Sequence, residues 1–150
     1  MRSEINSIGR IVSVAERALT RRLQKHFRDA GFSITVEQWR VLFYLWIEDG
    51  KSQKDLSNSV SRDKTSISRL INGLEKKDLV VRTNNRKDKR NNQIFLTPKG
   101  KSLKEKMMTF AQKTVKQAQN GITPEDIILC KKVLSKINSN LGVTEFEPVK

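Results

Sequence analysis

The stretch from Asp63 to Thr97 constrains the fold of this 150-residue chain more than any other part of its sequence. Its first half is typical of a short helix, which Asp63 would cap and in which apolar residues recur at helical spacing. Those apolar residues fall on one side of the helix: Ile67, Leu70, Ile71 and Leu74. Two strand-like runs follow, 79–83 and 93–97, with a polar tip between them. The pattern predicts a helix followed directly by a two-stranded hairpin.

The opposite side of the predicted helix is small and polar. Successive residues are rotated by about 100° around a helix, which places on this side Thr65, Ser68, Arg69, Asn72 and Lys76. Hydroxyl, amide and guanidinium groups are the groups that contact base edges and phosphates in DNA. Ordinary solvated helix faces have a similar composition, so the helix alone does not decide between the two interpretations.

The tip of the hairpin, residues 84–92, is strongly basic. Four cations occupy the five positions 86–90. Alone, such a tip would be interpreted as a solvated loop. Next to a helix-turn-helix pattern, we interpret it as a wing that lies on the DNA backbone and reaches the adjacent minor groove.

The net charge favours a polyanionic partner. The formal charge is +14 and the sequence pI is about 10.2. Residues 51–106 contain 16 Lys and Arg against 6 Asp and Glu, a net charge of +10, so most of the excess lies on the helix–hairpin region. Such an excess attracts nucleic acid or an acidic membrane surface, although a merely soluble basic protein would also carry it.

Two helices are predicted before this stretch. Thr35 and Gln38 form a capping-box pattern at the start of a helix over 36–48. Helical spacing assigns four residues to its core face: Trp39, Leu42, Phe43 and Trp46. A short helix over 53–59 follows, so the order is helix, turn, helix and hairpin.

Longer amphipathic helices are predicted on either side, over 4–30, 98–119 and 124–141. The first has no preceding element to pack on, so its apolar stripe needs a C-terminal helix or a second chain to cover it. Cys130 lies in the last stripe and is predicted to be a buried structural thiol. Residues 142–150 lack periodicity and are predicted to be a flexible tail.

The composition argues against several classes of protein. One cysteine excludes an intramolecular disulfide and a cysteine-based zinc cluster. With one histidine and no spaced carboxylate pair in an apolar setting, the chain has no acid–base or nucleophilic constellation. We therefore expect no enzyme activity, no metal and no cofactor. The sequence has no signal-peptide pattern and no apolar run near the ~18 residues of a membrane span, so we expect a cytoplasmic protein without a membrane partner.

The order of elements and three stretches resemble the MarR family of winged-helix transcriptional regulators over residues 5–141. ITVEQWRVLFYL (34–45) is similar to the family's entry into its second helix. DLSNSVSRDKTSISRLINGLEKKDLVVR (55–82) is similar to its helix-turn-helix and first wing strand. DKRNNQIFLTPKG (88–100) is similar to its wing signature, an Asp-x-Arg followed by Leu-Thr and a Gly three residues on.

The resemblance, carried over position by position, implies which residues contact DNA. In the recognition helix they are Lys64, Thr65, Ser66, Ser68 and Arg69, to which the polar helix face adds Asn72. In the wing they are Arg86, Lys87, Asp88, Lys89 and Arg90. Asp88 would pair with Arg90 and hold its guanidinium for a narrow minor groove. Ser52 and Gln53 match the start of the third helix, where amides and hydroxyls touch phosphate.

Two residues depart from the family pattern. Lys89 stands where Arg is frequent, which keeps the charge but loses the bidentate fork. Asp78 stands where Gly is usual at the end of the recognition helix, so this turn must use a less favourable residue. The peroxide-sensing branch carries a cysteine in its N-terminal helix, and this chain has none there, so thiol sensing is not implied.

The resemblance also implies the overall organisation and the partners. The fold class would be mainly α (α+β), with a winged helix-turn-helix lobe at 35–100 and dimerisation helices at 1–34 and 101–141. The chain would form a homodimer that binds a pseudo-palindrome in double-stranded DNA, with half-sites about one helical turn apart. It would act as a repressor, although the sequence does not exclude an activator.

A small aromatic or phenolic effector is a further implication of the resemblance. His26, Arg28, Trp39 and Phe43 lie on helices that would line a cleft for such a ligand. The alternative is that these four are core or surface residues that bind nothing. An effector would act by favouring a lobe spacing that does not fit DNA.

A basic RNA-binding or ribosome-associated structural protein is the alternative function. It would explain the charge equally well. However, Phe95 is the only aromatic residue in the basic region, so base stacking on single strands is poorly provided for. The sequence identifies neither the operator nor the regulated genes.

Overall fold

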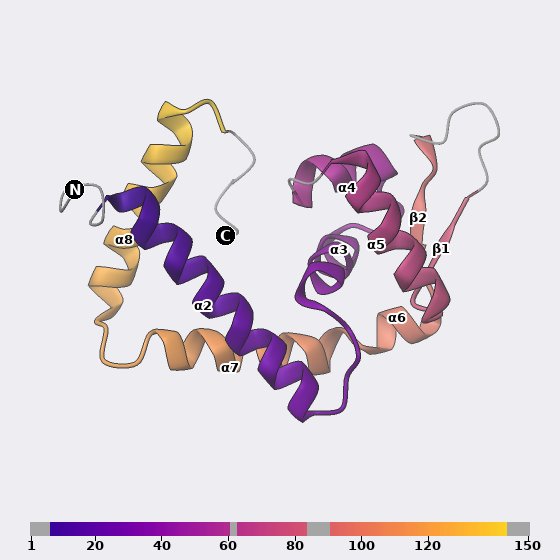
Figure 1. Cartoon of the computed structure of the whole chain (residues 1–150), viewed down its shortest axis with the longest axis horizontal. Coiled ribbons are helices and arrows are strands. Elements are labelled where there is room, and N and C mark those ends of the chain that lie inside the picture. Colours follow the sequence, from indigo (N-terminus) through magenta and orange to yellow (C-terminus); the bar gives the residue numbers. More distant parts are fainter. Residues whose placement is uncertain (1–6, 61–62, 84–90, 144–150) are drawn as a thin grey trace. The chain divides into compact units, whose positions relative to one another are not determined.

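The computed structural model describes residues 7–60, 63–83 and 91–143. The chain divides into two compact units, Met1–Thr114 and Val115–Lys150, which are described separately here. The described elements appear in chain order in Figure 1: α2 (Ile8–Asp29), α3 (Val36–Ile47), α4 (Gln53–Val60), α5 (Lys64–Lys76), β1 (Val80–Arg82), β2 (Ile94–Leu96), α6 (Pro98–Ser102), α7 (Lys104–Ala118) and α8 (Pro124–Asn140). None of the helices in these ranges has the length and apolarity needed to span a membrane.

Helix α2 begins later than the sequence predicted. The Ser7 side chain accepts a hydrogen bond from the Arg10 amide and caps the helix at Ile8. The predicted residues 4–6 lie outside the described part of the chain. The predicted stop is confirmed, because Gly31 has a φ of +81° and its N–H donates to the Arg28 carbonyl. Only glycine adopts this backbone conformation without steric cost.

Helices α3, α4 and α5 contact one another and form the core of the first unit, with β1 and β2 beside α5 (Figure 1). Local signals begin each helix as predicted. The α3 capping box is present, with Thr35 accepting from the Gln38 amide and Gln38 accepting from the Thr35 amide. At the start of α4, Ser52 Oγ accepts from the Asp55 amide at 3.0 Å. These caps satisfy N–H groups that have no partner within their own helix.

The predicted core face of α3 was partly wrong. The side chains that are buried are Val36, Val41, Leu42 and Leu45, whereas Trp39, Phe43 and Trp46 are only half-buried. These aromatic residues flank the buried face, and at Trp46 this position lets the indole N–H reach a polar partner. Trp46 does so by donating from Nε1 to the Gly100 carbonyl at 3.0 Å.

The predicted hairpin is present, and its strands are antiparallel, with Val80 opposite Leu96 and Arg82 opposite Ile94. A third segment pairs with the hairpin, and the sequence did not predict it. The Ile94 amide donates to the Lys51 carbonyl at 2.9 Å, the Gly50 amide donates to the Ile94 carbonyl at 3.0 Å, and Ser52 forms an isolated bridge with Gln93. Residues 50–52 therefore extend the hairpin on the side of β2, which attaches the wing to the loop before α4.

The single helix predicted over 98–119 is two helices, α6 and α7, separated at Leu103. Two side chains explain the interruption. The Gly100 carbonyl accepts from the Trp46 indole, and the Lys99 carbonyl accepts from Ser102 Oγ at 2.7 Å. Side-chain donors that occupy helix carbonyls bend and interrupt helices.

Helix α8 lies in the second unit and begins as predicted, with Thr123 accepting from the Asp126 amide. It has no buried residue. The prediction that Cys130 is buried is wrong for the single chain, in which this residue is exposed. In the described part of the chain, the apolar residues of this helix are half-buried or exposed. The predicted tail falls largely on residues 144–150, which lie outside the described part.

Candidate nucleic-acid interface

Helix α5 is held firmly on its inner side. Its core-facing residues Ile67, Ile71 and Leu74 are 0% exposed. Asp63 caps the helix, accepting from the Ser66 amide at 2.7 Å. This backbone hydrogen bond holds the pKa of the Asp63 carboxyl below its ordinary value. The cap and the buried stripe fix which side of α5 faces outward.

The outward side of α5 contains the residues that the sequence assigned to DNA. Thr65, Arg69 and Asn72 are exposed, and Ser66 and Ser68 are half-buried. The side chain of Lys64 lies outside the described part of the structure. The face therefore presents hydroxyl, guanidinium and amide groups together, which can donate to and accept from base edges.

At the start of α4, Ser52 and Gln53 are half-buried and partly engaged. Ser52 Oγ serves as the cap acceptor, which leaves its hydroxyl proton free to donate. The Gln53 amide donates to the Asn92 carbonyl at 2.9 Å. A phosphate at this position would thus meet the Ser52 hydroxyl or the Gln53 side chain, and not the Gln53 backbone N–H.

The base of the wing is closed by Thr83 and Gln93. The Thr83 amide donates to the Gln93 carbonyl at 2.9 Å, and the Gln93 amide donates to Thr83 Oγ1 at 2.8 Å. The predicted wing residues lie beyond this point and outside the described residues: Arg86, Lys87, Asp88, Lys89 and Arg90. The hairpin base thus fixes where the basic tip leaves the lobe.

The junction between α5 and the wing explains why the family-like sequence has Thr97 followed by a glycine three residues later. Asp78 has a φ of +57°, as its place at a position usually held by glycine suggested. The Leu79 amide donates back to the Leu74 carbonyl at 3.0 Å, a Schellman-type helix end. Thr97 Oγ1 donates to the Asp78 carbonyl at 2.6 Å and accepts from the Gly100 amide at 3.0 Å. Thr97 therefore joins the end of α5, the second wing strand and the start of α6.

Arg82 is a candidate DNA contact that sequence reasoning missed. It lies on β1 and approaches Glu75 of α5, with Nη1 3.7 Å from Oε1. Its Nε and Nη2 are buried and have no acceptor among the described residues. The Arg82 side chain is 22% exposed, so a DNA phosphate could reach the guanidinium only at its exposed part, and not at the buried Nε and Nη2. The only sequence signal was a cation within an otherwise apolar strand.

The effector cleft assigned to His26, Arg28, Trp39 and Phe43 stays a prediction. His26 is buried and Arg28 is exposed, while the rings of Trp39 and Phe43 are in contact, with centroids 5.5 Å apart. Trp39 Nε1 is buried without a partner in the described ranges. A cavity of about 460 Å³ lies along α2, and its lining includes Arg28 but not the other three.

Comparisons with known proteins agree with this geometry. The MarR family model matches residues 34–91, which hold α3, α4, α5 and the first wing strand. SarZ, an HTH-type transcriptional regulator of Staphylococcus aureus, is 31% identical over 100 residues, which cover 67% of this chain and 66% of SarZ. The matches cover between 40% and 66% of the length of the first curated relatives.

Solved structures extend the likeness to most of the chain. The transcriptional regulator PA3341 is 30% identical with a TM-score of 0.78, covering 91% of this chain and 98% of that one. A MarR family regulator from Listeria monocytogenes, solved with a 26mer DNA, is 26% identical with a TM-score of 0.78, covering 91% and 89%. The described fold, mostly helical with a two-stranded wing, is that of these proteins. The chain belongs to the MarR family of winged helix-turn-helix transcriptional regulators.

Proposed function

We propose that this protein binds double-stranded DNA in a sequence-specific manner and regulates transcription as a homodimer. The observation that carries the proposal is the arrangement of α5. One face is completely buried, and the other presents Thr65, Arg69 and Asn72 beside a closed wing base. Such a helix enters the major groove, while the wing follows the backbone. The relative from Listeria monocytogenes that was solved with DNA supports this assignment.

The dimer is proposed from the apolar residues that one chain leaves exposed. On α2 these are Ile8, Ile11, Val12 and Leu19, and on α8 they are Ile128, Leu129 and Val133. Apolar patches of this kind mark interaction surfaces. A two-fold dimer presents two recognition helices, so the expected target is a pseudo-palindrome with half-sites about one helical turn apart. The predicted division into a lobe at 35–100 and dimerisation helices at 1–34 and 101–141 belongs to this proposal.

Repression, and release by a small aromatic or phenolic effector, are the finer parts of the proposal. Repression follows where the operator overlaps a promoter, since a bound dimer excludes polymerase there. The effector is supported by the aromatic contact between Trp39 and Phe43 and by the Trp39 indole N–H, which has no partner among the described residues. The effector would lower the affinity for DNA by favouring a different lobe spacing. Titration of candidate acids into the DNA complex tests this part, and unchanged DNA affinity at saturation of the protein would exclude it.

The function is tested by selecting duplexes from a random pool with the full-length protein and then measuring affinity by fluorescence anisotropy. We expect a pseudo-palindromic winner that binds about 10³-fold or more tightly than a scrambled duplex. Log affinity should fall with log salt at a slope of about −0.9 per phosphate contact. Equal affinity for all duplexes would refute sequence specificity. Preference for single-stranded RNA would instead support the RNA-binding alternative.

A further inference from the structure

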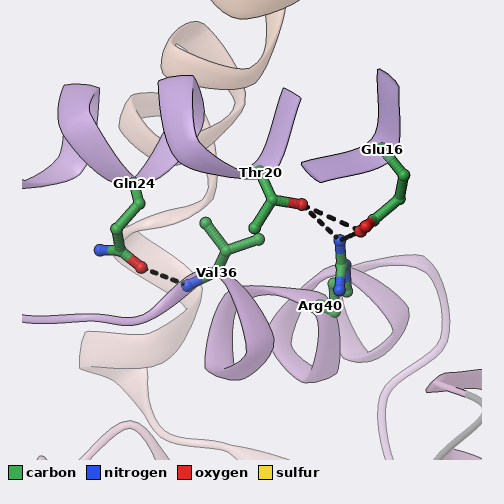
Figure 2. A network of polar contacts seen from close by, with 5 residues as sticks. All are labelled: Glu16, Thr20, Gln24, Val36 and Arg40. Atoms are coloured by element: carbon green, nitrogen blue, oxygen red, sulfur yellow. Dashed lines mark hydrogen bonds and ion pairs between the residues drawn. The ribbon is translucent and has the colours of Figure 1, made fainter. Parts of the chain in front are cut away.

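A ladder of polar side chains joins α2 to α3 (Figure 2). Its α2 members are Glu16, Thr20 and Gln24, spaced four residues apart and therefore aligned along one side of that helix. On α3 it meets Val36 and Arg40, which are also four residues apart. The contacts run in opposite order along the two helices, so α2 and α3 lie antiparallel, and all five residues belong to the same compact unit.

Gln24 forms a two-point contact at the start of α3. Its Oε1 accepts from the Val36 amide at 2.9 Å, and its Nε2 donates to the Ile34 carbonyl at 3.2 Å. The Val36 amide is one of the first N–H groups of α3, which have no partner within that helix. Both ends of the carboxamide are therefore used, and the two contacts fix its orientation as well as its position.

Arg40 forms the second contact of the ladder. Its Nη2 donates to Glu16 Oε1 at 2.8 Å and to Thr20 Oγ1 at 3.1 Å, while Thr20 Oγ1 donates to the same Glu16 oxygen at 3.0 Å. An exposed ion pair of this kind contributes little to stability. Its directional hydrogen bonds nevertheless define how far one helix can slide or rotate on the other, which apolar contacts alone do not.

The ladder continues from α3 to the recognition helix. Gln38 Oε1 accepts from Lys77 Nζ at 3.0 Å, directly after α5. A Cβ added at Gly73 of α5 would lie 2.7 Å from Gln38 Nε2, so the two helices are in close contact there. A change in the angle between α2 and α3 would therefore move α5 with it.

We propose that Glu16, Thr20, Gln24 and Arg40 are positioning residues that set the spacing of the half-sites this protein accepts. The inference rests on the proposed function, in which α2 belongs to the dimerisation region and α5 contacts DNA. Adding one base pair between half-sites moves one of them by about 3.4 Å and rotates it by about a tenth of a turn. A lobe held rigidly on α2 cannot follow that movement, whereas a lobe free to slide on α2 can.

The test uses the selected duplex and versions of it with one base pair added or removed between the half-sites. For the wild-type protein we expect each change to weaken binding by about tenfold, which is about the loss of affinity that one mismatched base pair causes. In Gln24→Ala and Arg40→Met the loss should shrink to about threefold or less. Arg17→Met is the matched control, because Arg17 is an exposed arginine on α2 that does not belong to the ladder. This variant should lose as much affinity as the wild type when the spacing changes.

Two volume-preserving variants separate positioning from folding. Gln24→Glu keeps an acceptor for the Val36 amide but loses the donor to the Ile34 carbonyl, and Thr20→Val removes only the hydroxyl. Both should relax the spacing preference while their affinity for a duplex with a single half-site stays within about twofold of wild type.

A spin label at Lys54→Cys in a Cys130→Ser background adds a measurement that needs no DNA. The distance distribution between the two lobes of the dimer should broaden in these variants.

The outcomes distinguish the two proposals. If the wild-type protein selects no preferred duplex, the proposed function is wrong. Alternatively, the wild-type protein selects a duplex and prefers one spacing of its half-sites. If the ladder variants then show the same spacing preference and equally narrow distance distributions between their spin labels, the proposed function stands and the positioning role is refuted.

Discussion

At the scale of single residues, the backbone of Gly100 lies very close to Leu79, the residue directly before β1. A Cβ at this position would lie 2.2 Å from the Leu79 carbonyl oxygen, far inside van der Waals contact. The same carbonyl accepts from the Thr97 amide at 3.0 Å, so it cannot move away without breaking the hairpin. The wing signature therefore has a glycine at this position because any side chain would collide with the Leu79 backbone, and not because the backbone needs to be flexible.

Gly100→Ala should therefore destabilise the folded protein by about 1–3 kcal/mol, the usual cost of overpacking. Gly9→Ala is the matched control, since Gly9 lies in α2 with nothing within 4 Å of an added Cβ. That variant should leave the free energy of unfolding unchanged or raise it by up to about 1 kcal/mol, because alanine favours a helix over glycine. Urea denaturation of both variants measures the difference. Equal stability of the two would show that the contact between Gly100 and Leu79 adjusts freely.

Asp78 is the other residue whose backbone is under constraint. Its φ of +57° lies in the left-handed region, which costs a residue with a side chain about 1–2 kcal/mol and is borne best by Gly, Asn and Asp. Asp78→Gly should be at least as stable as the wild type. Asp78→Val should be less stable by about 1–2 kcal/mol, the cost of the left-handed conformation. Thermal unfolding of both variants tests this. A more stable valine variant would contradict the left-handed turn.

At the scale of elements, local signals in the sequence were sufficient to predict where most helices begin. Thr35, Asp63, Thr97 and Thr123 each accept a backbone N–H at the predicted helix start. Such caps act within three residues, so a sequence reveals them directly. Most of the inner face of α5 was also predicted correctly, because Ile67, Ile71 and Leu74 follow a helical period and are buried. Leu70, the fourth residue of the predicted face, is half-buried.

Features that depend on distant residues were missed. Residues 50–52 lack strand-like alternation, and only their pairing with β2 reveals an extended strand. The break at Leu103 depends on the Trp46 indole, 54 residues from its acceptor Gly100. The four residues assigned to an effector cleft came from the family resemblance alone, and their assignment stays a prediction.

At the scale of the whole molecule, the proposed function requires a dimer. Leu129 of α8 is 58% exposed in the single chain, which is unusual for a large apolar side chain next to other apolar ones. The second chain is proposed to cover it. The apolar area buried in such an interface would make the stability of the fold depend on protein concentration.

Leu129→Glu should weaken dimerisation by at least tenfold, because a carboxylate would lose its hydration in the apolar interface. Lys131→Glu on the same helix is the control for added negative charge, since Lys131 is exposed and polar in the wild type. Sedimentation velocity over a range of concentrations gives the monomer–dimer equilibrium. An unchanged equilibrium for Leu129→Glu would place the dimer interface elsewhere.

The central claim is that the outer face of α5 determines which DNA sequence is bound. The most direct measurement repeats the duplex selection with Arg69→Ala, and with Arg17→Ala as a control that removes the same charge from α2. We expect Arg69→Ala to lose about 1–3 kcal/mol of discrimination at one or two base pairs of each half-site. Arg17→Ala should select the wild-type sequence. If Arg69→Ala selects the same sequence with the same preference at every position, α5 does not determine the specificity and the central claim is wrong.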